Sequence, residues 1–222
     1  MVAVTTLSEL TIDGKLTLGA GLSSKELFAF YGDELREWFH AQRAAHDAIM
    51  VGAGTVRADD PELTVRYAEG PNPIRIVPSN DGDLPSDATI LNDGGATWLA
   101  VPDDLPDAVA GPLAERAGVE ILRCGRGRVN LATLATLLAE RGVGSLIAEG
   151  GSRLLHALHA ADLVSRIVIK HIPVISGSHD AAPYLVRPEG AAPLALSRWR
   201  VAEWFVLGGV GVSIYEPLED CT

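Results

Sequence analysis

IMVGAGTVRADDP, residues 49–61, passes from an apolar strand into a glycine turn and then to a hydroxyl, two carboxylates and a proline. So many special residues in one short run indicate a binding site. We interpret the run as half of a dinucleotide site. The other half is Glu149-Gly150-Gly151-Ser152, which stands between an apolar strand pattern and a helical pattern.

The first half is not a Rossmann fingerprint. Gly52 and Gly54 follow a strand, but the fingerprint requires a third glycine where Arg57 stands. No helical pattern follows before Pro61. An ordinary glycine turn is the simple alternative, but paired carboxylates beside glycines are unusual in a plain turn.

The second half has the better chemistry for a phosphate. Gly151 opens a predicted helix, so backbone N–H groups point outward at a helix N-terminus. Glycine lets an anion approach the backbone closely, and the helix dipole favours negative charge. A plain strand-to-helix turn also uses glycines and remains the alternative. In an open α/β sheet, ligands bind at this carboxyl end of the strands.

Hydrophobic periodicity predicts an α/β fold. Strands are expected at residues 3–12, 48–51, 74–77, 97–101, 119–124, 145–148, 163–172, 201–207 and 210–215. Helices are expected at 24–45 (two pieces broken near Gly32, the second capped by Asp33), at 107–117, after an Asn130 cap, and after Gly151. Alternating strands and helices imply parallel pairing, and the short Gly208-Gly209 turn implies a C-terminal antiparallel strand pair. We expect one domain over residues 1–222, a mixed, mostly parallel sheet flanked by helices.

Composition restricts the function class. The chain has 222 residues, 47% hydrophobic, and a net charge of −11, which argues against a nucleic-acid binder. No apolar run approaches the ~20 residues of a membrane span, and the N-terminal residues do not resemble a signal peptide. With only Cys124 and Cys221, no disulfide framework is implied. We expect a cytoplasmic protein.

Three further candidates each have a simple alternative. Arg43, just before the strand that leads to Gly52, is a candidate phosphate ligand or a solvated helix-end charge. His156 and His159 are spaced as metal ligands, but no third ligand completes a site, so we expect no metal. Cys124 is expected to be a small buried hydrophobic residue and not a nucleophile.

Taken together, these motifs resemble the riboflavin-pathway pyrimidine reductases. The resemblance lies in IDGK (12–15), VGAGTVRADDPELTVR (51–66) and EGGS (149–152), with NPIRIV (72–77) and GRGRV (125–129) in support. The family occurs as the C-terminal domain of bifunctional deaminase-reductases and as free-standing enzymes in archaea and fungi. Because no zinc-deaminase sequence precedes the matching region, we expect the stand-alone form.

The resemblance implies a dihydrofolate-reductase-like fold, a homodimer, and NADPH-dependent reduction of the ribosyl group of a pyrimidine 5′-phosphate to ribityl. It places Glu149, Lys15 and Asp13 in catalysis, with Glu149 or a water that it orients as proton donor, and Arg43 and Glu149 on the substrate, Arg43 on its phosphate. The implied cofactor contacts are Thr55, Asp59, Leu63, Arg66, Ser79, Gly150, Gly151 and Ser152.

Three departures from the family lie on the expected substrate side. Leu7 stands where close relatives carry a polar or basic residue, and Glu9 stands where small residues are usual. Residues 19–29 lack the usual short tryptophan-containing stretch. Two alternatives therefore stay open: an NADPH-dependent reductase of a related pterin, pyrimidine or secondary metabolite, and a non-catalytic nucleotide-binding relative.

Overall fold

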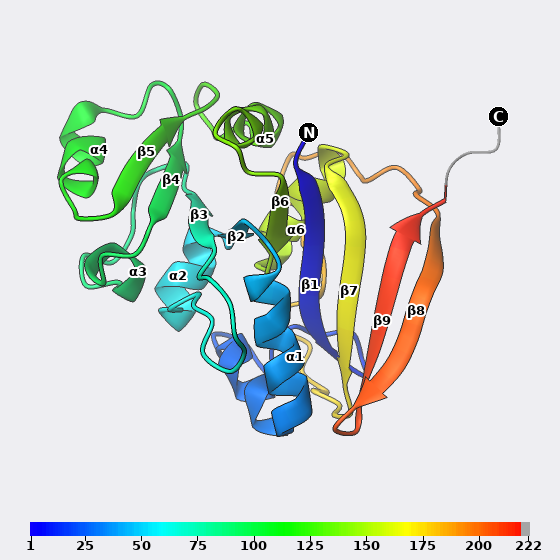
Figure 1. The fold of residues 1–222 in the computed structure, drawn as a ribbon. Coiled ribbons are helices and arrows are strands. Elements are labelled where there is room, and N and C mark those ends of the chain that lie inside the picture. The colour runs from blue at the N-terminus through cyan, green and yellow to red at the C-terminus, as the bar shows by residue number, and fades with distance from the viewer. Residues whose placement is uncertain (219–222) are drawn as a thin grey trace.

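The computed structural model describes residues 1–218, in which helices and strands alternate along most of the chain (Figure 1). The strands are β1 (Ala3–Thr11), β2 (Ala48–Met50), β3 (Ile74–Pro78), β4 (Thr97–Val101), β5 (Val119–Arg123), β6 (Ser145–Ala148), β7 (Val164–Ile172), β8 (Trp199–Leu207) and β9 (Val210–Pro217). The helices are the 3-10 helix η1 (Ser24–Phe30) and the α-helices α1 (Asp33–Ala44), α2 (Ala53–Asp59), α3 (Thr89–Asn92), α4 (Asp107–Ala114), α5 (Leu131–Glu140) and α6 (Ser152–Ala160). Cys221 lies outside the described residues.

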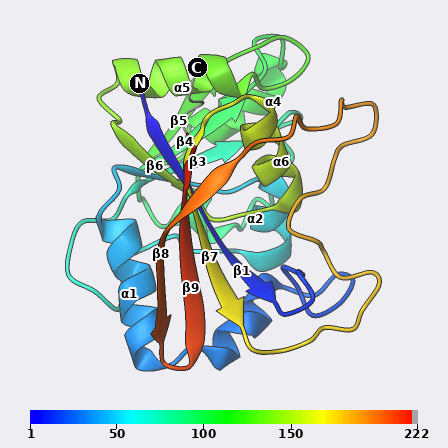
Figure 2. The ribbon, with the colours of Figure 1, turned by 90° about the vertical axis from the view of Figure 1, so that its right-hand side faces the viewer.

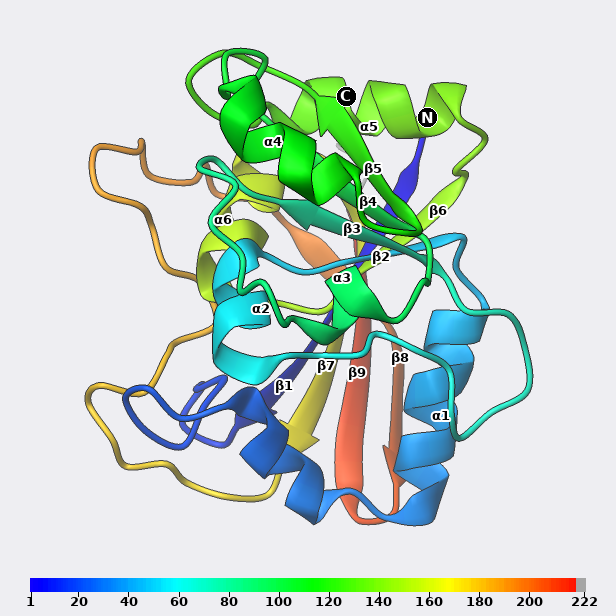
Figure 3. The ribbon, with the colours of Figure 1, turned by 90° about the vertical axis from the view of Figure 1, so that its left-hand side faces the viewer.

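The strands form one sheet in the order β5-β4-β3-β2-β6-β1-β7-β9-β8. Pairing is parallel from β5 to β7, whereas β9 pairs antiparallel with both β7 and β8. The predicted fold class, with its closing antiparallel pair joined at Gly208-Gly209, is confirmed. Figure 2 faces the edge formed by β8, and Figure 3 faces the opposite edge, where α4 and β5 lie.

Successive side chains on each strand point to opposite faces of the sheet, so the core has a layer on each face. In β2 and the residue after it, Ile49 and Val51 belong to the cluster that contains Leu35 and Phe39 of α1, while Ala48 and Met50 belong to the cluster under α5 and α6. Side chains two apart on a strand share a face, so α1 to α4 cover one face and α5 and α6 the other. Figure 2 shows α1 and α6 on opposite sides of the sheet.

Two details of the predicted secondary structure were wrong. A seven-residue helix, α2, follows Gly52, where no helix was expected. Gly32, and not Asp33, occupies the N-cap position of α1, and no side chain caps this helix. The first predicted helical piece forms as a 3-10 helix, and the Ser23 side chain caps it by accepting a hydrogen bond from the Lys25 amide. The Asn130 cap of α5 is confirmed, with its side chain accepting from the Thr133 amide at 3.0 Å.

No helix within residues 1–218 is both long and apolar enough to cross a bilayer.

Candidate active site

Two cavities open at the carboxyl ends of the central strands. The large cavity has a volume of about 980 Å³ and is lined by both glycine motifs, with Ser79 and Asn80 after β3. The small cavity, of about 80 Å³, lies beside it and is lined by residues of α1 and of the segment after α2. Five residues line both cavities: Glu9, Ser24, Thr55, Asp59 and Glu149. We call this shared wall the junction.

The two motifs meet because β2 and β6 are neighbours in the sheet. The Glu149 amide donates to the Met50 carbonyl at 3.0 Å, which sets the end of β6 beside the turn into α2. Gly151 is the N-cap of α6 with φ +89°, and a Cβ there would lie 3.1 Å from the Thr55 hydroxyl. Glycine is therefore required both by the backbone conformation and by the close approach of α2.

The helix α2 explains why only one of its two carboxylates faces the cavities. Thr55 and Asp59 are four residues apart, so they lie on the same face of the helix and both line the junction. Asp59 Oδ2 accepts from the Ser24 hydroxyl at 3.2 Å, whereas Oδ1 is buried and has no hydrogen-bond partner within residues 1–218. Asp60 instead caps α3 by accepting from the Thr89 amide and hydroxyl, each at 2.8 Å.

Arg43 and Glu149 form a buried, bidentate ion pair at the junction. Arg43 Nε donates to Glu149 Oε1 at 2.7 Å and Nη2 to Oε2 at 2.6 Å, and Nη1 donates to the Thr64 carbonyl at 2.9 Å. The Arg43 and Glu149 side chains are only 6% and 8% exposed. Burial alone would lower the pKa of Arg43, but the charge and hydrogen bonds of Glu149, with the charges of Glu9 and Tyr31, together outweigh it and raise the pKa. The guanidinium is thus already paired inside the protein, and its contact with a substrate phosphate stays a prediction.

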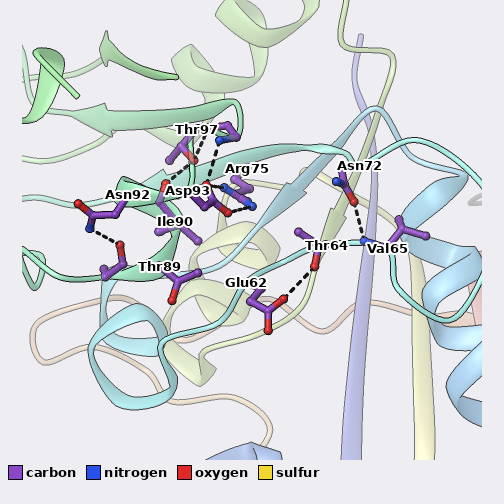
Figure 4. Close-up of polar contacts among 12 residues, drawn as sticks. Glu62, Thr64, Val65, Asn72, Arg75, Thr89, Ile90, Asn92, Asp93 and Thr97 are labelled. Atoms are coloured by element: carbon purple, nitrogen blue, oxygen red, sulfur yellow. Dashed lines mark hydrogen bonds and ion pairs between the residues drawn. The ribbon is translucent and has the colours of Figure 1, made fainter. Parts of the chain in front are cut away.

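The segment after α2 forms the outer wall of the small cavity. Leu63 is buried with φ +55°, and Arg66 forms an ion pair with Glu62. The Val65 amide donates to Asn72 Oδ1 at 2.7 Å, which fixes the extended segment against the loop before β3 (Figure 4). Leu63 and Arg66 both line this cavity.

His40 of α1 supports that wall as a neutral side chain. Its Nδ1 accepts from the Arg66 amide at 3.1 Å. Burial, with the positive charges of Arg43 and Arg66, lowers the pKa of His40 from 6.5 to about 4. The imidazole is therefore neutral at physiological pH, with Nδ1 as the acceptor.

Ser79 and Ser152 line the large cavity, but each hydroxyl has a protein partner. Ser79 Oγ donates to Asp81 at 3.0 Å and accepts from the Gly82 amide at 3.1 Å. Ser152 Oγ donates to the Pro183 carbonyl at 2.6 Å. Both residues therefore shape loops at the cavity rim, in addition to any contact with a ligand.

Asp13 and Lys15 are not brought to the cavities. The Asp13 carboxylate accepts from the Thr11 hydroxyl at 2.7 Å and from the Ser176 and Gly177 amides at 2.9 and 3.0 Å. These contacts lower the pKa of Asp13 to about 2 and tie the loop after β1 to the loop after β7. Lys15 forms an isolated antiparallel β-bridge with Pro183, which also joins the loop after β1 to the loop after β7. Neither residue lines either cavity, and their catalytic role stays a prediction.

The remaining candidates are structural in position. Cys124 is buried, as expected, and burial raises the pKa of its thiol to about 11. His156 is buried in α6, and His159 packs edge-on against Trp199 with ring centroids 6.0 Å apart. Within the described part of the chain, no group of three or more His, Cys, Asp and Glu side chains is arranged to hold a metal.

Two features of the site were missed from the sequence. Lys170 of β7 is completely buried, 3.0 Å from Glu9 of β1. Four arginines line the large cavity: Arg57, Arg128, Arg153 and Arg187. The position of Lys170 beside Glu9 depends on which strands are neighbours. Arg57 and Arg153 lie in α2 and α6, whereas Arg128 and Arg187 come from loops, so the four meet only in the folded chain.

The sequence matches the RibD C-terminal domain family over residues 2–210. The chain is 40% identical over 204 residues to the 2,5-diamino-6-ribosylamino-4(3H)-pyrimidinone 5′-phosphate reductase of Aquifex aeolicus, covering 91% of this chain and 90% of that protein. It is 35% identical to the reductase of the same name from Methanothermobacter thermautotrophicus, covering 84% of each chain.

Solved structures share the fold. The riboflavin biosynthesis reductase Rib7 of Saccharomyces matches with a TM-score of 0.75 at 19% identity, over 98% of this chain and 90% of that one. The deaminase/5-amino-6-(5-phosphoribosylamino)uracil reductase of Thermotoga maritima matches with a TM-score of 0.74 at 21% identity, over 98% of this chain. The present chain spans 57% of that bifunctional protein. On the match over residues 2–210 and the identity to the curated reductases, this chain belongs to the RibD C-terminal domain family.

Proposed function

We propose that this chain is an NADPH-dependent reductase that converts the ribosyl group of a pyrimidine 5′-phosphate of riboflavin biosynthesis to ribityl. Two of its relatives are named as reductases of 2,5-diamino-6-ribosylamino-4(3H)-pyrimidinone 5′-phosphate. The observation that carries the proposal is the junction. A reductase must hold two ligands with their reacting atoms within ~3–3.5 Å. Here a large cavity and a small one share a single wall of five side chains.

The large cavity fits a nicotinamide dinucleotide. Its volume of about 980 Å³ is at the upper end of the usual range for ligand sites. A Cβ added at Gly54 or Gly150 would meet no atom within 4 Å, so the backbone there is open to a ligand. Asp59 Oδ1 is a buried acceptor without a partner in residues 1–218 and suits a ribose or amide donor.

The four arginines in the same cavity favour NADPH over NADH. A cationic side chain accommodates the additional 2′-phosphate of NADPH. Four of the residues that line this cavity are arginines, in a chain whose net charge is −11, and five carboxylates line it as well: Glu9, Asp59, Asp81, Glu149 and Glu189. We assign the dinucleotide to this cavity, with its pyrophosphate at Gly150, Gly151 and Ser152, and the substrate to the junction and the small cavity.

The chain's own residues then position the substrate. When bound, the nicotinamide would supply a hydride to C1 of the open-chain imine form of the ribosylamine, and a proton completes the amine. Glu149 is held on both oxygens by Arg43, so it acts as an acceptor that orients the substrate or a proton-delivering solvent molecule. Leu63 and the Arg43–Phe39 stack, 4.6 Å from Cζ to the ring centroid, exclude water from that point.

We also propose a homodimer. Val201, Trp204 and Val206 on edge strand β8 are 58%, 59% and 63% exposed, and the strand register places them on the face opposite Phe205, which packs against Trp38 of α1. An exposed apolar row on a sheet edge favours association. Sedimentation of Trp204→Glu tests it: a dimeric parent and a monomeric variant are expected. A cytoplasmic location stays a prediction.

The test of the function is a single assay. Purified protein, NADPH and the diamino-ribosylamino-pyrimidinone phosphate are mixed, and the loss of NADPH absorbance is followed. Turnover with formation of the ribityl product is expected. NADPH binding without turnover would favour the non-catalytic alternative, and an NADPH-independent melting temperature would contradict the proposal at its base.

A further inference from the structure

Glu9 and Lys170 form a buried cross-strand pair beside the junction. They are paired residues in the register of β1 and β7, on the face that packs against α1. Lys170 is 0% exposed, with Nζ 3.0 Å from Glu9 Oε2 and 3.8 Å from the centroid of the Phe39 ring. The Tyr31 hydroxyl donates to the same carboxylate oxygen at 3.3 Å. The contacts from buried Lys170 and from the Tyr31 hydroxyl hold the Glu9 carboxylate in place.

The Glu9 carboxylate nevertheless has acceptor capacity to spare. An ionised carboxylate offers about four acceptor positions, and the contacts with Lys170 and Tyr31 both use Oε2. Within residues 1–218 no hydrogen bond involves Oε1. The side chain is 11% exposed and lines both cavities together with Glu149. The Glu9–Lys170 pair therefore does not serve the core alone, because the Glu9 carboxylate reaches the junction, where the two ligands would meet.

We propose that Glu9 is a substrate-contacting, specificity-determining residue that accepts hydrogen bonds from the amino edge of the pyrimidine and selects a 2-amino-pyrimidinone over the corresponding uracil. This inference rests on the proposed function. Lys170 and Tyr31 are positioning residues, because they act through Glu9.

The two candidate substrates differ in the hydrogen-bonding groups that they would present to Glu9. The two reductases that are 40% and 35% identical to this chain are named for a 2,5-diamino-6-ribosylamino-4(3H)-pyrimidinone, whereas the bifunctional enzyme of Thermotoga is named for a uracil. In the pyrimidinone, the 2-amino group and N3–H are adjacent donors, and a carboxylate accepts from such a pair. In the uracil, the 2-position is a carbonyl oxygen, which places a second acceptor against the carboxylate.

The size of the expected discrimination follows from burial. A site built to hydrogen-bond a substrate N–H leaves a buried polar group unpaired when that donor is missing, and such sites reject the analogue by large factors. We expect wild-type protein to prefer the pyrimidinone over the uracil by roughly 100-fold or more in kcat/KM.

The experiment compares both substrates in wild type, Glu9→Gln, and Glu9→Gln combined with Lys170→Met. The double variant removes the buried ammonium that would otherwise lose its partner, so it stays testable if the single variant unfolds. The expected result is that kcat/KM for the pyrimidinone falls roughly 100-fold while the value for the uracil stays within about threefold. The affinity for NADPH is expected to stay unchanged.

Asp93→Asn is the matched control. Asp93 also pairs with a buried cation, Arg75, but lies outside both cavities (Figure 4). It tests whether any broken buried pair alters substrate choice, and its substrate ratio is expected to equal that of wild type.

Each outcome is decisive. If wild type reduces neither substrate, the proposed function fails. If wild type reduces a substrate but its preference survives in both Glu9 variants, the inference fails and the function stands. Equal losses on both substrates, with weaker NADPH binding, would place Glu9 on the cofactor and overturn the inference. The inference is supported by a ratio that collapses in the Glu9 variants alone.

Discussion

Arg43 and Arg75 are both buried, and each donates to both oxygens of one carboxylate, but the surroundings of the two pairs differ. Arg43 donates hydrogen bonds to both oxygens of Glu149 at 2.7 and 2.6 Å. Arg75 donates to both oxygens of Asp93 at 2.7 and 2.5 Å (Figure 4). Both arginines are about 5% exposed or less. Glu149 lines both cavities, whereas Asp93 ties the end of α3 to β3 and lines neither.

Two hydrogen bonds from a buried arginine therefore do not by themselves mark a carboxylate as a candidate site residue. A buried ion pair is weak evidence for a stabilising design, since its desolvation offsets much of its attraction. What separates the two is the chain around them. The Glu149 pair sits where parallel strands end and two cavities meet, and the Asp93 pair sits under a four-residue helix. The predictions that follow test this contrast.

Replacing Glu149 should have the largest effect. In Glu149→Gln, which keeps the size of the side chain, turnover should fall roughly 100-fold or more, because the substrate or the proton-delivering solvent molecule is no longer correctly oriented. Glu149→Ala should also lose about 3–5 kcal/mol of stability, because Arg43 is left buried without a counter-charge. Turnover of the folded Gln variant, with NADPH saturating, is the measurement. A Gln variant with wild-type kcat would contradict the assignment of Glu149.

One glycine close to each pair, Gly151 and Gly95, gives the second contrast. Gly151→Asp requires φ +89° of a non-glycine residue and presses a Cβ to 3.1 Å from Thr55 Oγ1. It also places negative charge at the assigned pyrophosphate site, so the Kd for NADPH should rise roughly 100-fold. Gly95→Ala puts a Cβ 2.6 Å from Arg75 Nη1. That variant should lose stability only. Calorimetric titration separates the two, and weakened binding in Gly95→Ala would remove the contrast.

Sequence reasoning recovered the fold because the strand patterns are strong. Runs such as Leu163–Ile172 and the Gly208-Gly209 turn carry their own local signals, and β7 and the closing hairpin formed where expected. The helix α2 was missed because Gly52 precedes it, Gly54 lies inside it, and only Ala53 and Val56 are buried. Neighbouring elements, and not propensity, hold that helix in place.

The site was predictable only where it is contiguous in sequence. Glu149 to Ser152 and Thr55 to Asp59 were identified from motifs, and the structure brings them to one pair of cavities. Lys170 was not identified, because its role depends on the parallel register of β1 with β7, 161 residues apart at the Glu9 pairing (170 − 9). Asp13 fits the family motif, yet its carboxylate is used to join two loops.

Asp93→Asn should separate stability from activity. Removing the charge leaves Arg75 buried without a full partner, so the free energy of unfolding should fall by about 1–3 kcal/mol, less than for Glu149→Ala because Asp93 is one-third exposed. Denaturant unfolding gives this value, and kcat/KM of the folded variant should match wild type. A tenfold loss of kcat/KM would mean that α3 influences the site.

The smallest expected effect is on how stability changes with pH. It should differ between His40, beside the cavities, and Asp93, away from them. The folded-state pKa of His40 is about 4, below its ordinary 6.5, so between these values the unfolded chain binds more protons. The contribution of neutral His40 to the free energy of unfolding is complete above about pH 6.5 and is lost as the pH falls toward 4. The pKa of Asp93 is lowered by its hydrogen bond to Arg75, so that contribution is complete above its ordinary 3.8 and is lost only in stronger acid.

His40→Asn keeps an acceptor for the Arg66 amide and removes the titration. Between about pH 7.5 and 5, the variant should lose less stability than wild type, by about 1 kcal/mol. Asp93→Asn should show the wild-type difference over that range, because the Asp93 carboxylate is ionised throughout it. Unfolding curves for the three proteins at both pH values measure this. If Asp93→Asn and not His40→Asn flattened the response, the mildly acidic sensitivity would belong to the region away from the cavities, and His40 would not be neutral in the folded protein.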